Sequence, residues 1–423
     1  MNEENLTLVN DRNPDSWLCR LLRLDSLDQP WLESLSQADW MGVVRSSIWH
    51  SLAPILYKQL ITQSYSDHIP KEALRDLREC YLQCLSRGIL RMHTLSQLLR
   101  AFQDEGIPVI PLKGAYLAEA IYGDPALRPM SDLDLLFRKP DLPRVVDKLT
   151  SMEYQPARKF WIEYHCSVSH ELPPFHKAGS PPISAHWTLI LPALNYNIDL
   201  DGLWRRANLC SIFEMKIHSL APEDLLLHLC MHAATQHLLR SGLRMTYDVA
   251  VTLKHFQDEI DWEALSTRAE QWNASRVTYL MFFLAKQLFG APTPHGFLEK
   301  LRPGNFNPEI VEVASNLIFI GRQDFSTFSP ELAALLKAKG ALARGRLILS
   351  RIFPPPIEMA RLYPVMPDSP KIILYYPVRV KDVLFKHLRS GLKLISGEQS
   401  TVDSARLALI RTEQEDWLVK SLT

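Results

Sequence analysis

The chain has 423 residues, and its 47 basic side chains balance its 47 acidic ones. At roughly 150 residues per domain, this length predicts two or three domains, or one large core with helical extensions. Apolar residues make up 47% of the chain, which excludes a mainly disordered protein, and zero net charge gives no overall attraction to nucleic acid or to membranes.

The location of the protein is predicted from its apolar runs and its first residues. No apolar run reaches the roughly 18–20 residues that a membrane helix needs. The first five residues, Met1–Asn5, are acidic and polar, unlike a secretory signal. We therefore expect a cytoplasmic protein without a membrane span, whose six cysteines are reduced and mostly buried in the core.

Helices are predicted for most of the first hundred residues, because apolar side chains recur there at spacings of three and four. The predicted helical stretches are Trp17–Leu24, Trp40–Ile61 and Lys71–Phe102. Pro70 precedes the last of these and Gly106 follows it, as is typical of helix ends. Region 1–105 is therefore expected to be a helical N-terminal region.

The pattern changes after Gly106 to short β-branched runs that alternate with short helical segments. In chain order we expect a strand at Ile107–Leu112, a helix at Ala115–Tyr122, a strand at Asp132–Phe137, a helix at Leu142–Met152 capped by Asp141, and strands around Phe160–His170 and Ile183–Leu191. This order predicts a small mixed α/β core at about 106–200.

From about Pro222 the pattern is helical again, with a capped helix start at Asp261 and further helices at Val249–Phe256 and Trp272–Leu288. The predicted fold class is α+β, with a small mixed-sheet core at 106–200 between helical regions 1–105 and 201–423. Residues 331–395 contain 12 Lys and Arg against 4 Asp and Glu. Since aromatic residues are not interleaved with these basic residues in a repeated pattern, we expect a solvated helical face there rather than an RNA site.

Asp132 and Asp134 are the strongest candidates for chemistry. They alternate along a predicted strand, so both carboxylates leave the same face, with their roots about 7 Å apart. This spacing suits two divalent ions about 3.5–4 Å apart, the arrangement that stabilises phosphoryl and nucleotidyl transfer. The alternative, for an isolated Asp-x-Asp, is a solvated edge strand.

Four nearby residues are candidates for nucleotide binding: Lys113, Gly114, Arg128 and Ser131. Gly114 opens a predicted helix, where phosphate can reach backbone N–H groups. Lys113 and Arg128 can neutralise phosphate charge, although both could instead be ordinary surface charges. Ser131 is expected to be a turn residue rather than a nucleophile.

The sequence resembles a large bacterial family of mostly uncharacterised nucleotidyltransferases of the polymerase-beta type. The motif that carries this resemblance is Leu112-Lys113-Gly114, a helix ending in Tyr122, and then Arg128-x-x-x-Asp132-Leu-Asp134-Leu-Leu. Weaker matches extend over about residues 40–390: His186-Trp187, the apolar segment with His228 and His232, Leu243-Arg244 with Asp248, and Asp261-Trp262.

The resemblance implies Mg²⁺-dependent transfer of a nucleoside monophosphate from an NTP, with ATP expected from prevalence, to an unknown acceptor such as a small molecule, a sugar, a peptide or a protein. It assigns Asp132 and Asp134 to the metal ions. In related sequences a third acid stands two residues before His-Trp, where this chain has Ser184. Candidate substitutes are Glu171, His186, Asp199 and Asp201, and the sequence does not choose among them.

Two other polar groups have a structural and a functional interpretation. His228 and His232 lie four residues apart on one predicted helical face, so they could bind Zn²⁺ or could pack in the core, and packing is favoured because no HExxH motif is present. Asp248 could brace the core or contact nucleotide.

The predicted function is nucleotidyl transfer. The alternative is a degenerate member of the fold that binds only nucleotide or a partner protein, and Ser184 favours this alternative. A weaker third hypothesis is RNA modification, which rests on the basic segment 331–395.

Overall fold

The computed structural model describes most of the chain as two compact units. The described residues are 13–25, 31–32, 34–63, 65, 68–239, 241–304, 306–319, 346, 349, 352–363, 365 and 369–383. The first unit contains the described residues up to 157 and from 161 to 319, and the second contains 158–160 and the described residues from 346 to 383.

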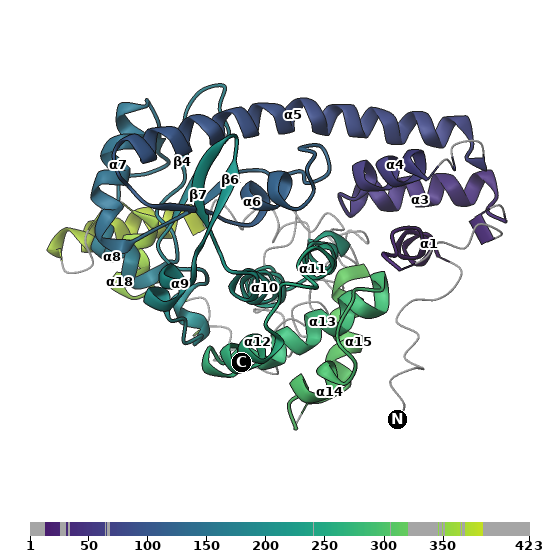
Figure 1. The fold of residues 1–423 in the computed structure, drawn as a ribbon. Helices are drawn as coiled ribbons and strands as arrows, with labels where there is room; N and C mark the ends of the chain where they lie inside the picture. Colours follow the sequence, from purple (N-terminus) through teal and green to yellow (C-terminus); the bar gives the residue numbers. More distant parts are fainter. Residues whose placement is uncertain are drawn as a thin grey trace. The chain divides into compact units, whose positions relative to one another are not determined.

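The N-terminal part of the first unit is helical, as predicted. Its helices are α1 (Pro14–Leu21), α3 (Gln37–Trp49), α4 (Ala53–Thr62) and α5 (Lys71–Asp104). The stretch predicted as one helical segment at Trp40–Ile61 forms two helices, because the backbone of Ser51 is left-handed (φ 57°) and Pro54 begins the first turn of α4. Figure 1 shows α5 extending past helices α3 and α4 to the region of α7.

The centre of the first unit is a five-stranded mixed sheet, which confirms the predicted fold class. The strands are β1 (Val109–Pro111), β2 (Leu133–Phe137), β3 (Gln155–Pro156), β4 (Phe175–His176) and β5 (Ile183–His186). Their order is β1-β2-β5-β4-β3, with β2 parallel to β5 and the other neighbours antiparallel. Helix α6 (Lys113–Ala120) connects β1 to β2, and helix α7 (Leu142–Ser151) connects β2 to β3. The parallel β2–β5 pair brings two segments 50 residues apart in sequence into direct contact.

Three predictions for this core were wrong in detail. Residues Ile162–Val168 form helix α8 rather than a strand, since tertiary packing of Tyr164 overrides the β propensity of an aromatic segment. The last strand ends at His186 rather than at Leu191. Asp141 precedes α7 without capping it, because a 3₁₀ turn leads into the helix and its carboxylate accepts from Arg144 instead.

A β-hairpin lies in the region that was predicted to be helical after residue 200. Strands β6 (Asn208–Ile212) and β7 (Met215–Ser219) follow helix α9 (Leu200–Arg206) and pair antiparallel. The two residues between them, Phe213 and Glu214, both have positive φ (52° and 62°). Such a turn matches the twist of paired strands but usually contains Gly or Asn, so no residue here signals a turn.

Two buried helices, α10 (Pro222–Met231) and α13 (Ser275–Phe289), form the centre of the last helical part of the first unit. The helices that pack around them are α11 (Leu243–His255), α12 (Trp262–Gln271), α14 (Phe297–Leu301) and α15 (Glu309–Phe319). A single π-helical turn, His232–Gln236, continues α10. The predicted cap of α12 is confirmed, since the Asp261 carboxylate accepts from the backbone N–H groups of Glu263 and Ala264.

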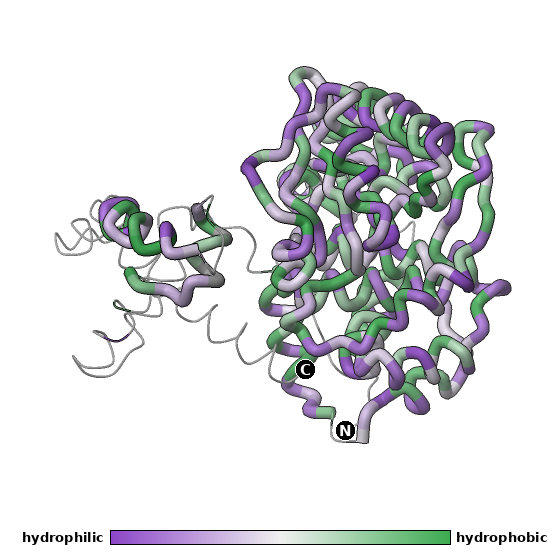
Figure 2. The backbone as a smooth tube through the Cα atoms, turned by 90° about the vertical axis from the view of Figure 1, so that its left-hand side faces the viewer, coloured by the Kyte–Doolittle hydropathy of each residue, from purple (hydrophilic) through white to green (hydrophobic). Residues whose placement is uncertain are grey.

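Hydrophobic and hydrophilic positions alternate along the helices of the first unit (Figure 2), as expected of helices that bury one face. In the described part of the chain, no helix has the length and apolar character needed to cross a membrane.

The second unit contributes a small cluster in which Met359, Val365 and Ile372 are buried against three tyrosines. Its described helical segments include α18 (Pro356–Leu362) and the 3₁₀ helix Pro370–Leu374, and residues 375–383 are also helical. Most of the basic segment 331–395 lies outside the described residues.

Candidate functional site

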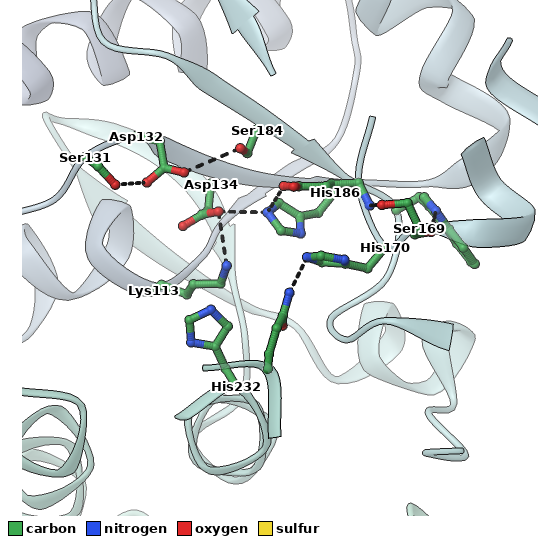
Figure 3. Close-up of polar contacts among 12 residues, drawn as sticks. Lys113, Ser131, Asp132, Asp134, Ser169, His170, Ser184, His186 and His232 are labelled. Atoms are coloured by element: carbon green, nitrogen blue, oxygen red, sulfur yellow. Dashed lines mark hydrogen bonds and ion pairs between the residues drawn. The ribbon is translucent and has the colours of Figure 1, made fainter. Parts of the chain in front are cut away.

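The two candidate carboxylates lie together at the start of β2, facing β5. In the parallel register, Asp134 is opposite Ser184. The Ser131 hydroxyl donates to Asp132 Oδ1 (2.8 Å), and the Ser184 hydroxyl reaches Asp132 Oδ2 at 3.5 Å. Figure 3 shows Asp132 and Asp134 side by side, with Ser184 next to Asp132. The predicted shared face of the two carboxylates and Ser184 is therefore confirmed.

Asp134 is buried between a lysine and a histidine. Lys113 Nζ lies 3.1 Å from Asp134 Oδ1, and His186 Nε2 lies 2.8 Å from the same oxygen. Burial alone would raise the pKa of Asp134, but the charge of Lys113 and the hydrogen bond with His186 outweigh it and hold this pKa far below its usual value. Asp134 is therefore ionised at neutral pH.

Lys113 and Gly114 form the junction between β1 and α6. The Lys113 backbone is left-handed (φ 46°), which is strained for a lysine and is typical of functional sites. This conformation accompanies the burial of its side chain beside Asp134, where only 11% of the side chain is exposed. A Cβ on Gly114 would lie 3.0 Å from Met130 Cβ, so the absence of a side chain there lets the loop before β2 pack against the start of α6.

Arg128 is paired with Asp248, an acid from a distant helix. Its Nη2 lies 2.8 Å from Asp248 Oδ2, and the Tyr122 hydroxyl donates to Asp248 Oδ1 at 2.9 Å. Both charged side chains are buried, with 7% and 2% exposed. The Pro129 carbonyl also accepts from Arg128 and from Arg244 of α11. Of the two predicted roles for Asp248, these contacts favour bracing the loop that carries the candidate site.

Two of the four substitutes for a third acid reach the candidate site. Glu171 Oε2 lies 3.3 Å from His186 Nε2, and the two residues form a β-bridge. Asp199 instead caps α9 by accepting from Gly202 N–H, and Asp201 lies exposed in the first turn of the same helix. The site therefore places a histidine and a glutamate next to the aspartate pair.

His170 is a site residue that the sequence analysis did not identify. Its ring centroid lies 5.1 Å from that of His186, and the Gln236 side-chain amide contacts its Nε2. Burial, followed by the charges of His186 and Lys113, lowers the pKa of His170 to about 3. The bridge between Glu171 and His186 brings His170 to the site, and no local sequence signal predicts that bridge.

The pair His228 and His232 extends the buried histidines on the α10 side. Their rings are 5.8 Å apart, and His232 Nε2 lies 3.1 Å from His237 Nε2. Figure 3 shows His232 below Lys113. Burial lowers the pKa of both well below the usual value, followed in each case by the charge of Lys113. Across the described residues, the one group of three side chains spaced to hold a metal ion is His170, Glu171 and His186. His228 and His232 do not belong to this group.

The site has one acid on β2 and a second directly before it, beside a helix whose second residue is a glycine, which is the arrangement that the sequence resemblance predicts. In a comparison with protein families, a family described as uncharacterised nucleotidyltransferases matches residues 36–290, more than half of the chain. The chain belongs to this nucleotidyltransferase family. Comparisons with curated proteins and with solved structures found no significant match.

Proposed function

We propose that the protein transfers a nucleoside monophosphate from an NTP, preferentially ATP, to an acceptor hydroxyl or other nucleophile, and releases pyrophosphate. The observation that carries this proposal is the pair formed by Asp134 on β2 and Asp132 directly before it, next to the start of α6. The family match supports the reaction class. A cytoplasmic location is also part of the proposal.

The donors of the site fit Mg²⁺ in part. Mg²⁺ prefers carboxylate oxygens, and the site offers two adjacent carboxylates, of which Asp134 is held ionised. Asp132 and Asp134 would hold the ion, which when bound neutralises charge on the phosphates. Opposite Asp134 on β5, however, the chain has the hydroxyl of Ser184 rather than a third carboxylate.

The other residues of the site would position the nucleotide. We propose that Gly114 and the first turn of α6 approach the phosphates, where N–H groups and the helix dipole favour negative charge. Lys113 is the cation at this position, and it would exchange its contact with Asp134 for a phosphate oxygen. Ser131 would orient Asp132 through its hydroxyl. Arg128 lies beside Gly114 and is paired with Asp248, and it would bind the triphosphate from this buried position.

The second candidate is a nucleotide-binding or partner-binding module without catalysis. Ser184 favours it, because a missing carboxylate weakens metal binding and removes the usual base for an acceptor hydroxyl. Both candidates use the same fold, and they differ in whether bound NTP is converted.

Calorimetric titration of ATP and then the other NTPs, with and without Mg²⁺, tests the proposed site. We expect Mg²⁺-dependent binding to wild type and a loss of at least ~10-fold in affinity in Asp132→Asn and Asp134→Asn, which keep the side-chain shape but remove a metal ligand. Asp147→Asn, on the exposed face of α7, is the matched control and should bind as wild type does. If no NTP binds, or if all three variants bind equally well, the proposed site is wrong.

A further inference from the structure

His186 Nε2 lies at the centre of a cluster of possible metal ligands. Asp134 Oδ1 is 2.8 Å from this nitrogen and Glu171 Oε2 is 3.3 Å from it. His170 adds a further ring nitrogen, and the ligand atoms of His170, Glu171 and His186 all lie within 4.8 Å of one another. The His186 side chain is fully buried, whereas 26% of the Glu171 side chain is exposed, so the cluster reaches the surface through Glu171.

These separations match those of atoms that share one metal ion. With bonds of about 2.0–2.2 Å, neighbouring ligand atoms lie about 2.8–3.6 Å apart in octahedral or tetrahedral geometry. The distances from His186 Nε2 to its two carboxylate partners fall near this range. The ligand atoms of all three residues lie within 4.8 Å of one another, and the partly exposed, rotatable side chain of Glu171 can adjust to an ion between them.

The charge of the cluster also favours a cation. Two carboxylates, Asp134 and Glu171, approach the same imidazole nitrogen, which carries at most one hydrogen to donate. Lys113 compensates Asp134, but among the described residues no Lys or Arg pairs with Glu171. A divalent ion would satisfy both carboxylates and the imidazole nitrogen together.

The mixture of donors selects the kind of ion. Mg²⁺ favours oxygen ligands, whereas imidazole nitrogen suits Zn²⁺ and other transition-metal ions such as Ni²⁺ and Cu²⁺. The contact of Gln236 with the His170 ring is the kind of supporting contact that orients histidine ligands in metal sites.

We infer that His170, Glu171 and His186 bind a divalent transition-metal ion directly beside Asp134. Its further role rests on the proposed function: Asp134 contacts the cluster through His186, so it lies between this ion and the proposed Mg²⁺–nucleotide. The site would then combine a nitrogen-ligated ion with an oxygen-ligated one.

The test is a titration of metal-free protein with Co²⁺ in the absence of nucleotide, followed by visible absorption and by displacement with Zn²⁺. We expect one Co²⁺ per chain with a ligand-field spectrum that Zn²⁺ abolishes. Glu171→Gln and His170→Gln should each weaken Co²⁺ at least ~10-fold. Glu163→Gln on α8 and His176→Gln on β4 make the same chemical changes at exposed positions and should leave Co²⁺ binding unchanged.

The outcomes separate this inference from the proposed function. If wild type binds no Co²⁺, or if Glu171→Gln and His170→Gln both bind it as tightly as their controls, the inference is wrong, whatever happens with ATP. Asp132→Asn should lose Mg²⁺–ATP and keep Co²⁺, because Asp132 does not belong to the cluster. Co²⁺ binding without any NTP binding would support the metal site and refute the proposed function.

Discussion

The buried pair of Arg128 and Asp248 allows a quantitative test of how the candidate site is supported. Asp248→Asn keeps the size of the side chain but leaves the Arg128 guanidinium, 7% exposed, without its counter-charge. Removing one partner of a buried ion pair costs about 3–5 kcal/mol. Tyr122→Phe deletes one hydrogen bond to the same carboxylate, which is worth about 1.5–3 kcal/mol for a charged acceptor.

The assay is urea unfolding followed by tryptophan fluorescence, with the free energy of unfolding compared between variants. Asp76→Asn is the matched control: Asp76 pairs with Arg75, whose side chain is 69% exposed, and such surface pairs contribute about 0–1 kcal/mol. We expect Asp248→Asn to lower the free energy of unfolding well beyond Asp76→Asn, with Tyr122→Phe in between. Equal effects of the two Asp→Asn changes would refute the bracing role of Asp248.

Two further predictions follow from buried or partly buried titrating groups. Burial keeps His228 and His232 neutral in the folded protein. As the pH falls, these two histidines are therefore protonated at a higher pH in the unfolded chain than in the folded protein. Their contribution to stability is complete above about pH 6.5 and is lost as the pH falls, by up to about 2.7 kcal/mol per pH unit for the pair. A plot of the free energy of unfolding against pH should therefore have a smaller slope between about pH 6.5 and 5 in His228→Gln than in wild type. An unchanged slope would contradict this. The hydrogen bond from Cys80 lowers the pKa of Cys84 to about 7, against the effect of burial, whereas burial raises the pKa of Cys230. Peptide mass spectrometry after iodoacetamide treatment should therefore show alkylation of Cys84 rising between pH 6 and 8 with Cys230 unmodified, and equal labelling of the two would contradict it.

Local signals predicted the elements that carry the aspartate pair. The strand at Asp132–Phe137 was predicted from alternating polarity, and helix α6 from the apolar segment between Gly114 and Gly123. The Asp261 cap was predicted from its position before Trp262. In each case the residues that determine the element are close neighbours in sequence, so a short segment of sequence is enough to predict it.

Long-range contacts account for what the sequence did not predict. The proposed metal-ligand cluster and its contact with Asp134 need the bridge between Glu171 and His186 and the register of β5 against β2, and no local sequence pattern predicts either. The pairing of Arg128 with Asp248 joins residues 120 positions apart. The β6–β7 hairpin was missed because its turn, at Phe213 and Glu214, contains none of the usual turn residues.

The most direct test of the proposed function is a crystal structure with Mg²⁺ and a non-hydrolysable ATP analogue. We expect a metal ion bound by the carboxylates of Asp132 and Asp134, with the triphosphate against Gly114 and within reach of Lys113. A nucleotide bound elsewhere, or an aspartate pair that still holds Lys113 and His186 with no ion while nucleotide is bound, would contradict it.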